Sequence, residues 1–310
     1  MLENHARQLK AIFSEFIIDT MNGIMVFDEN DQIIFCNKVI TEMFRPPSDI
    51  SHLYGQTFNQ MVAHCYHSNT GLVIDTDNLE SWLEYACNKR RSEKYRRFEI
   101  DLHDGRWFQI SEQLVNDNCI VMIATDITDK KDAELRLAEM SQKLFLLATT
   151  DALTNVSNRR HFMEQAQAEQ KRCQREQFNY ALLMLDLDSF KEINDNHGHA
   201  CGDAVLTAIA NTIKLALRDY DLLGRIGGEE FAILLPNTTR TAALSISERI
   251  RDSVEKLNIT SNGHAVKTTV SIGVALNKNT DKNLEEMLLI ADKLLYQAKE
   301  NGRNQVVICC

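Results

Sequence analysis

The sequence predicts a chain of α/β and α+β class in which two domains are joined by a helix. Residues 22–128 consist of short alternating segments separated by hairpin turns, which is typical of an antiparallel sheet. Apolar residues recur at helical spacing over residues 129–150, and helix and strand patterns alternate from residue 151 onward. A chain of 310 residues is long enough to bury two cores of ordinary size.

Composition and charge exclude several classes of protein. Apolar residues make up 44% of the chain and charged residues 25%, as in soluble globular proteins. The net charge of −10 argues against a nucleic-acid binder, although an acidic protein still binds a nucleotide where a metal and local basic residues offset the phosphates. No apolar run approaches the roughly 20 residues that span a bilayer, and the first residues lack the order of a signal peptide. We therefore expect a cytoplasmic protein without membrane insertion.

Cysteine spacing predicts neither disulfides nor a zinc site. The eight cysteines are scattered without paired C-x-x-C spacing, so we expect reduced thiols. The segment His64-Cys65-Tyr66-His67 is the nearest approach to a ligand cluster, but an ordinary helix or loop is the favoured interpretation. A haem held by His64 or His67 is the less favoured alternative.

Two stretches carry apolar residues at spacings of four and three, the heptad pattern of helices that pair. We assign the first to an amphipathic helix over residues 1–21 and the second to a helical linker over residues 129–150. A helix packing on its own domain explains either stretch alone, but two of them flanking one domain favour a parallel homodimer. The apolar positions are Leu2, Ala6, Leu9, Phe13 and Phe16 in the first stretch, and Ala133, Leu137, Met140, Leu144 and Leu147 in the second.

Between these helices, residues 22–128 predict strands joined by tight turns. GIMVFDENDQIIFCN and FEIDLHDGRWFQISEQLV each predict a hairpin, the second around Asp104-Gly105, and CIVMIATDIT predicts another apolar strand. This pattern resembles a PAS sensor domain, in which a five-stranded antiparallel sheet cups a small-molecule pocket. The resemblance implies a small-molecule signal whose identity the sequence leaves open. Trp107 either lines that pocket or belongs to the core.

Carboxylates gather at two places in residues 151–310. Asp186 and Asp188 end the apolar run YALLMLDLD, which predicts a central strand covered on both faces, and their spacing places them on one side. Glu229 and Glu230 follow Gly227-Gly228, where a backbone or phosphate can approach closely. Clustered hard oxygen ligands suit Mg²⁺. Each pair alone is more simply a solvated strand end, and only the combination favours a metal site.

The stretch RIGGEEF resembles the signature of the GGDEF family, the diguanylate cyclases, in its GGEEF form. Members condense two GTP into cyclic di-GMP and release two pyrophosphates. The resemblance covers residues 151–310 and implies a central mixed sheet covered by helices, as in nucleotidyl cyclases and polymerase palm domains. The sequence departs from the usual pattern at Asn155-Val156 and at Ser189. The other motifs that match, in order, are DALT (151–154), NRR (158–160), LDLDSFKEINDNHGHACGD (185–203), SIGVA (271–275) and YQAKENGRN (296–304).

The resemblance implies roles for individual residues. Asp186 and Glu229 correspond to carboxylate ligands of Mg²⁺ (or Mn²⁺), with the backbone carbonyl of Leu187 as a third ligand. Glu229 also corresponds to the general base for the ribose 3′-hydroxyl, and Glu230 to a ligand of the metal or the ribose. Lys191 would neutralise charge that develops on the phosphates.

The same resemblance implies a GTP site. Asn194 and Asp203 correspond to the guanine-reading residues, because an amide and a carboxylate match an edge that adenine lacks. His199 corresponds to a further substrate contact, and Gly227 and Gly228 make room for GTP. The residues that correspond to clamps on the β- and γ-phosphates are Lys299 and Arg303.

A product-binding site is expected at Arg218 and Asp221, which lie ahead of Gly227 in the register of the family's RxxD inhibitory motif. An ordinary charge pair at a helix end is the alternative. Because a cyclic product needs two facing half-sites, the resemblance implies an active homodimer that the PAS domain controls through residues 129–150. The alternatives left open are a catalytically weak domain that only binds GTP or cyclic di-GMP, and a cyclase for another nucleotide.

Overall fold

The computed structural model describes residues 2–44, 53–116, 118–261, 264–277 and 282–309. The chain divides into two compact units, an N-terminal unit of residues 1–139 and a C-terminal unit of residues 140–310. Helix α5, Thr128–Thr149, contains the division between them. The expected linker 129–150 coincides with this helix. No helix among the described residues is long and apolar enough to cross a membrane.

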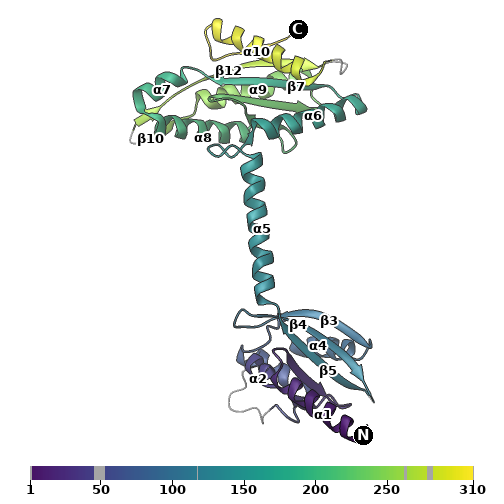
Figure 1. The fold of residues 1–310 in the computed structure, drawn as a ribbon. Coiled ribbons are helices and arrows are strands. Elements are labelled where there is room, and N and C mark those ends of the chain that lie inside the picture. Colours follow the sequence, from purple (N-terminus) through teal and green to yellow (C-terminus); the bar gives the residue numbers. More distant parts are fainter. Residues whose placement is uncertain (1, 45–52, 117, 262–263, 278–281, 310) are drawn as a thin grey trace. The chain divides into compact units, whose positions relative to one another are not determined.

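The N-terminal unit is built on a five-stranded antiparallel sheet with the strand order β2-β1-β5-β4-β3 (Figure 1). The expected hairpins are present as β1/β2 and β3/β4, and the third apolar strand is β5. In the described part of the chain, helices α2, α3 and α4 follow β2 before the chain returns to the sheet. The elements are α1 Leu2–Asp19, β1 Gly23–Phe27, β2 Ile33–Cys36, α2 Lys38–Phe44, α3 Phe58–Ser68, α4 Leu79–Arg90, β3 Tyr95–Asp101, β4 Trp107–Val115 and β5 Cys119–Asp126.

The core of this unit lies between the sheet and helices α2 to α4. Side chains of β4 alternate between buried and half-buried positions over Phe108–Glu112, so one face of the strand meets the core. Helix α3 begins with a capping box, in which the Thr57 hydroxyl accepts from the Gln60 amide and the Gln60 side chain accepts from the Thr57 amide. The segment His64–His67 belongs to this helix, as the favoured interpretation expected.

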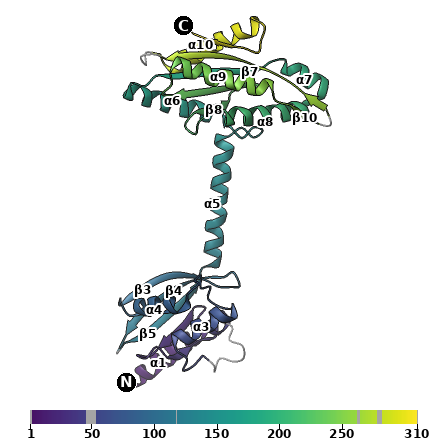
Figure 2. The ribbon, with the colours of Figure 1, turned by 180° about the vertical axis from the view of Figure 1, so that it is seen from behind.

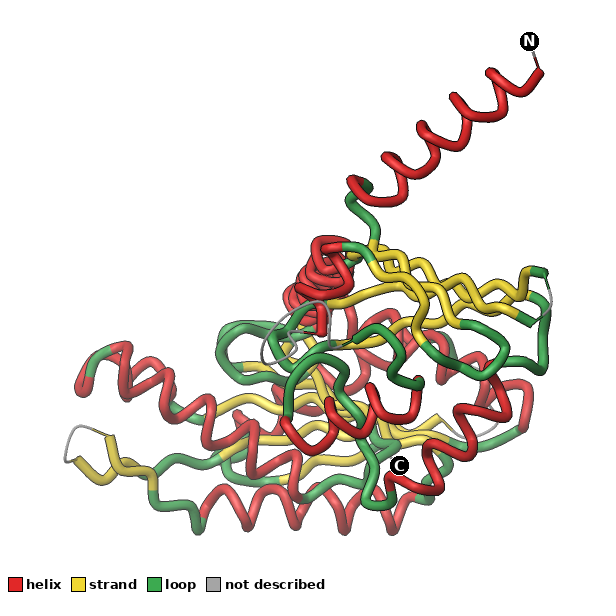
Figure 3. The backbone as a smooth tube through the Cα atoms, turned by 90° about the horizontal axis from the view of Figure 1, so that it is seen from below, coloured by secondary structure: helices red, strands yellow, loops and turns green. Residues whose placement is uncertain are grey.

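Helices α1 and α5 leave apolar side chains exposed. Figure 3 shows α1 extending from the sheet of its unit. None of the residues of α5 is buried. An exposed apolar row on a helix is stabilised only when another surface covers it. The large exposed side chains are Leu9, Ile12, Phe13, Phe16 and Ile18 on α1, and Leu135, Leu137, Met140, Leu144, Phe145, Leu146 and Leu147 on α5.

The C-terminal unit has a mixed six-stranded sheet with the order β13-β12-β7-β9-β8-β6. The pairs β12/β13 and β6/β8 are parallel and the others are antiparallel. The two ribbon views show the helices packed along the sheet (Figure 1, Figure 2). The elements are β6 Ser157–Asn158, α6 Arg159–Glu176, β7 Tyr180–Leu187, α7 Phe190–His197, α8 His199–Leu215, β8 Leu222–Arg225, β9 Glu230–Pro236, α9 Arg240–Glu255, β10 Ile259–Ser261, β11 His264–Val266, β12 Val270–Asn277, α10 Leu284–Glu300 and β13 Val306–Ile308.

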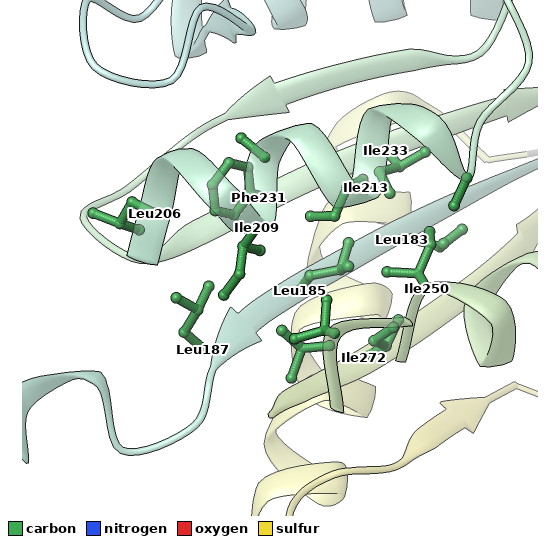
Figure 4. Close-up of a cluster of buried hydrophobic side chains, with 14 of the residues drawn as sticks. Leu183, Leu185, Leu187, Leu206, Ile209, Ile213, Phe231, Ile233, Ile250 and Ile272 are labelled. Carbon is green, nitrogen blue, oxygen red and sulfur yellow. The ribbon is translucent and has the colours of Figure 1, made fainter. Parts of the chain in front are cut away.

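Strand β7 is central and buried on both faces, which explains its continuous apolar run. Its odd-numbered side chains, such as Leu183 and Leu185, pack against α8 and α9 (Figure 4). Its even-numbered side chains, such as Leu182 and Met184, pack against α6 and α10. The predicted fold class is therefore confirmed in both units. The seven described cysteines are free thiols, as expected, and Cys310 lies outside the described residues.

Candidate active site

The site begins where β7 leaves the core. Asp186, the second-last residue of β7, is 5% exposed, and its Oδ1 lies 2.7 Å from Nζ of Lys299. Lys299 belongs to the last turn of α10. In the register of β7 and β9, Asp186 lies opposite Glu230. The sheet therefore brings the acids of residues 186 and 229–230 to one place, although 43 residues separate Asp186 from Glu229 along the chain.

Glu229 ends the turn before β9, and Glu230 is the first residue of β9. The amide of Leu187 donates to the carbonyl of Glu229 at 3.4 Å, and the amide of Ile226 donates to the carbonyl of Glu230 at 3.0 Å. A Cβ on Gly227 would lie 2.2 Å from Oε2 of Glu230, so the missing side chain leaves room for that carboxylate. A Cβ on Gly228 would meet nothing within 4 Å. Only Gly228 thus opens onto free space of the kind a phosphate would use.

Two carboxyl groups of this site, those of Asp186 and Glu229, have raised pKa values. Burial raises the pKa of Asp186, although Lys299 acts in the opposite direction. Burial also raises the pKa of Glu229, and the charges of Asp186 and then Glu230 add to that effect. These acids are therefore close enough to repel one another, and one ammonium group does not offset them. A divalent cation would favour their ionised forms, so the residues fit a metal.

No group of three His, Cys, Asp or Glu side chains in the described part of the chain is arranged to hold a metal by itself. Mg²⁺ usually takes only one or two carboxylates from the protein and completes its shell with water and substrate phosphates. Asp186 and Glu229 match that requirement better than a closed cage of carboxylates would.

Asp188 shares a side with Asp186, as expected, because its charge adds to burial in raising the pKa of Asp186 and its partner Ser271 lies opposite Asp186 in the sheet, but its oxygens are occupied within the protein. Its Oδ1 accepts from the hydroxyl of Ser271 at 2.7 Å. Its Oδ2 accepts from the hydroxyl of Thr269 at 2.6 Å and from the amide of Asn304 at 3.1 Å. Asp188 therefore ties β7 to β12 and to the loop after α10.

The expected guanine-reading residues lie on two consecutive helices. Asn194 is half-buried on α7, and a Cβ on Gly202 would lie 2.0 Å from its Oδ1, so glycine admits the Asn194 amide against α8. Asp203 follows Gly202 and is exposed. Gly198, with φ of 80°, makes the turn between the helices. The fold thus brings Asn194 and Asp203 to the same helix–helix corner. The two other expected contacts here, Lys191 and His199, are exposed.

The loop after α10 carries Arg303, which is exposed and has φ of 64° in the left-handed region. Its amide donates to the carbonyl of Ala298 at 3.0 Å, which closes the helix. The charge of Arg303 acts to lower the pKa of Asp186. Lys299 and Arg303 therefore both face the carboxylate site from the end of α10.

Arg225, the last residue of β8, is a residue that motif reasoning missed. Its Nε and Nη2 donate to the carbonyl of Gly228 at 3.1 and 2.6 Å, and its Nη1 lies 2.9 Å from Oδ1 of Asp151. Asp151 stands two residues after α5 and also accepts from the amide of Thr154 at 3.0 Å. One guanidinium therefore links the end of α5 to the turn before Glu229. The only sequence signal was an arginine two residues ahead of a glycine pair.

The expected product-binding pair lies beside a separate cavity of about 460 Å³. Oδ2 of Asp221 accepts from the Arg218 amide at 2.9 Å, while its Oδ1 is buried with no hydrogen-bond partner among the described residues. The Arg218 guanidinium donates to the Tyr220 hydroxyl at 2.8 Å. Burial raises the pKa of Asp221. The cavity is also lined by Phe145 and Thr149 from the end of α5.

Comparison with known proteins agrees with this geometry. The family model described as diguanylate cyclase, GGDEF domain, matches residues 148–305. This chain belongs to the GGDEF family of diguanylate cyclases. A PAS-fold model matches residues 18–135, so the N-terminal unit is a PAS domain.

Curated relatives match part of the chain. Diguanylate cyclase A of Treponema denticola is 38% identical over 176 residues, which are 56% of this chain and 47% of that protein. The chain spans about half the length or less of the curated relatives it matches first.

Two solved structures also resemble the chain. Diguanylate cyclase SiaD of Pseudomonas aeruginosa, in complex with its activator SiaC, is 38% identical with a TM-score of 0.52 over 59% of this chain and 69% of that one. The coiled coil and GGDEF domain of DgcB from Caulobacter crescentus, in complex with c-di-GMP, is 29% identical with a TM-score of 0.56 over 59% and 97%.

Proposed function

We propose that this chain is a diguanylate cyclase that joins two GTP molecules into cyclic di-GMP and releases two pyrophosphates. The observation that carries the proposal is the pair Asp186 and Glu229, two partly or fully buried acids with raised pKa values beside the open turn at Gly228. Such a pair suits a site that binds a metal–nucleotide complex.

Asp186, Glu229 and the carbonyl of Leu187 would hold Mg²⁺ or Mn²⁺, with Glu230 beside them. When bound, the cation supplies Lewis-acid stabilisation of charge on the phosphates. Glu229 accepts the proton of the ribose 3′-hydroxyl, a task that its raised pKa suits. The 3′-oxygen then attacks the α-phosphate in line and pyrophosphate leaves.

Cations of this chain position the phosphates. Lys299 pairs with Asp186 at 2.7 Å and would turn to the β- and γ-phosphates once substrate is present. Arg303 approaches from the loop that follows α10, and Lys191 offsets charge that develops on the reacting phosphate. Gly228 leaves open space for the phosphates, and Gly227 leaves room for the Glu230 carboxylate beside them.

Guanine is the proposed base. Asn194 and Asp203 present an amide and a carboxylate at one corner, which can pair with a guanine edge but leave adenine with unpaired polar groups. His199 adds a contact at the start of α8.

The proposed active form is a homodimer, because one site binds one GTP and a cyclic product needs two facing sites. The exposed apolar rows on α1 and α5 supply a surface for pairing. We assign residues 1–21 to an N-terminal helix, 22–128 to the PAS sensor, 129–150 to the helical linker and 151–310 to the cyclase. A small molecule at the PAS domain would control the rate through the linker. The proposed location is the cytoplasm.

Product inhibition is proposed at Arg218 and Asp221. The unpartnered Oδ1 of Asp221 is an acceptor for a guanine edge, and the cavity beside it has room for a base. Substituting Arg218→Ala should keep the initial rate and raise product yield in long incubations several-fold, as followed by product concentration over time. Tyr220→Phe, which keeps the arginine, serves as the control. Parallel progress curves for wild type and Arg218→Ala would contradict the proposal.

The central test incubates the full chain with GTP and Mg²⁺, with ATP as the control nucleotide, and identifies the products by mass spectrometry. Cyclic di-GMP and pyrophosphate from GTP alone are the expected result, and Glu229→Gln should form neither. GTP binding without product would favour a binding module, and turnover of ATP would favour another nucleotide.

A further inference from the structure

The PAS domain contains a cavity of about 490 Å³, a size typical of small-molecule sites. It lies between helices α3 and α4 and the strands β3, β4 and β5. Aromatic side chains provide much of its wall, and two of them remain exposed, Tyr85 by 64% and Phe98 by 36%. Exposed rings around a hollow are apolar surface that a flat apolar ligand would cover. The aromatic residues are Phe44, Phe58, Trp82, Tyr85 and Phe98.

One end of the cavity is charged. Glu112 lines it and is 2% exposed. Its Oε1 lies 2.6 Å from Nη1 of Arg90, and its Oε2 accepts from Nε of Arg96. Both oxygens of this carboxylate are therefore occupied by guanidinium groups. A cationic ligand would have to displace an arginine to reach them.

The surrounding network holds more positive than negative charge. Arg90, with no side-chain exposure, also approaches Asp31 at 3.4 Å, and Asp31 pairs with Arg91 at 2.9 Å. Three guanidinium groups, including that of Arg96, therefore share two carboxylates. Burial lowers the pKa of Arg90, which shows that holding this charge away from water is costly. The imbalance would be relieved by one bound anion.

Arg96 is the group positioned to bind that anion. Its side chain is 19% exposed, and its guanidinium carbon lies 4.6 Å from the centre of the Phe98 ring. Only Nε makes a hydrogen bond with a described residue, so its two terminal nitrogens are available as a planar pair of donors. A carboxylate matches that pair in geometry and charge.

Other lining carboxylates do not favour a cation. Glu99 lies 2.5 Å from Nζ of Lys131, and Glu93 is exposed to water. Asp101, at the end of β3, is half-buried. The lining also holds Lys89 and Arg97, which offset these acids at the rim.

We propose that this cavity binds a small organic acid with an aromatic or other flat apolar body. Its carboxylate accepts from both terminal nitrogens of Arg96, and its body lies among Trp82, Tyr85 and Phe98. The inference rests on the sensory role proposed for the PAS domain, but binding is measured apart from cyclase activity, so either can fail without the other.

The chain offers a local optical probe, because its two tryptophans, Trp82 and Trp107, both lie in the PAS domain and only Trp82 lines the cavity. Full-length Trp107→Phe protein is titrated with phenylacetate, phenylacetamide, phenethylamine and acetate, following Trp82 emission. Saturable binding of phenylacetate is expected, with the amide and the amine at least about tenfold weaker, since the charge-assisted pair is lost. Acetate should bind weakly because it lacks the apolar body.

Variants then locate the site. Arg96→Met should weaken phenylacetate binding about ten- to a hundredfold, and Arg96→Lys should weaken it less because charge remains without the planar pair. Arg106→Gln is the matched control, since Arg106 also lies over a phenylalanine ring, 5.4 Å from that of Phe108, but outside the cavity. Far-ultraviolet circular dichroism confirms that each variant is folded.

Three outcomes would overturn the inference. Equal binding of acid and amide would show that charge is not recognised, and preference for the amine would indicate a cation site at the rim acids. If no probe binds saturably up to about 10 mM, the cavity is not a site for small aromatic acids, because a dissociation constant above that concentration is too weak for a specific ligand.

Discussion

The two units bury an excess of charge of opposite sign. In the PAS domain, three arginines share the two carboxylates of Asp31 and Glu112. In the cyclase domain, the acids Asp186, Glu229 and Glu230 gather around one ammonium group, that of Lys299. Partly compensated charge away from water is costly unless a partner of opposite sign is supplied. The first imbalance suits the proposed organic anion and the second suits the proposed divalent cation.

Asp188 shows what a purely structural buried acid looks like by comparison. Two hydroxyls and one amide satisfy its oxygens, and it needs no ion. The adjacent Asp186 has one ammonium partner and a raised pKa. Two acids that are two residues apart therefore serve different purposes, which alanine substitutions can separate.

The largest expected effect comes from Asp186→Ala. We expect cyclase turnover to fall by about a thousandfold or more, because the proposed metal ligand is removed, while the free energy of unfolding without metal changes by less than about 1 kcal/mol. Asp188→Ala should instead lower the free energy of unfolding by about 2–4 kcal/mol, since three donors lose their acceptor. Urea unfolding and cyclic di-GMP production measure the two quantities. Equal loss of stability in both variants would refute the distinction.

Breaking the PAS charge network should have the next largest effect. Glu112→Gln removes the carboxylate charge nearest to the buried Arg90 guanidinium and leaves Asp31, at 3.4 Å, as its carboxylate partner, so we expect the free energy of unfolding of the PAS domain to fall by about 3 kcal/mol. Tryptophan emission reports this unfolding selectively. The control is Glu99→Gln, which breaks an exposed ion pair with Lys131 and should leave the unfolding midpoint unchanged. An unchanged midpoint in Glu112→Gln as well would mean that the network contributes nothing.

A smaller effect is expected where α5 meets the catalytic turn. Arg225→Lys keeps the charge but cannot donate to both Asp151 and Gly228, so the turn before Glu229 loses its fixed position. We expect kcat to fall about tenfold with little change in the KM for GTP. Arg172→Lys, which alters an ion pair within α6, should leave both parameters unchanged. A rise in KM alone would point to substrate binding instead.

The smallest expected effect is the pH dependence of metal binding. The pKa values of Asp186 and Glu229 are raised in the folded protein, so protons compete with the metal at higher pH than they would at exposed acids. Mg²⁺ affinity should therefore fall as pH drops through the raised pKa values, and binding should release protons.

The stability of the metal-free protein should change with pH in the direction opposite to the Mg²⁺ affinity. A carboxyl whose folded pKa is raised contributes stability below its unfolded pKa, and that contribution is lost as pH rises through the folded pKa.

Calorimetry of Mg²⁺ binding in two buffers of different ionisation enthalpy measures the proton release on metal binding, and Asp186→Asn should reduce that release. Binding without proton release would contradict the raised pKa values.

Local sequence determined much of this protein. Periodicity alone predicted the antiparallel sheet of the PAS domain, the helix α5 and the buried strand β7. A strand buried on one face has an apolar residue at every second position, and a helix buried on one face has one about every 3.6 positions. A strand buried on both faces is apolar throughout and shows no repeat. The motif around Gly227-Gly228 identified the family. The residues assigned to the metal, the guanine base and the phosphates remain a prediction from motif matching.

The tertiary structure decided what each charged residue contacts. Asp188 differs from Asp186 because the donors Thr269, Ser271 and Asn304 reach it from other segments, whereas Lys299 reaches Asp186 across 113 residues of sequence. The pairing of Arg225 with Asp151 and of Arg90 with Glu112 likewise depends on segments that only the fold brings together. Periodicity records how a side chain is buried but not its partner, because hydrogen bonds and ion pairs depend on distances between elements that no local pattern encodes.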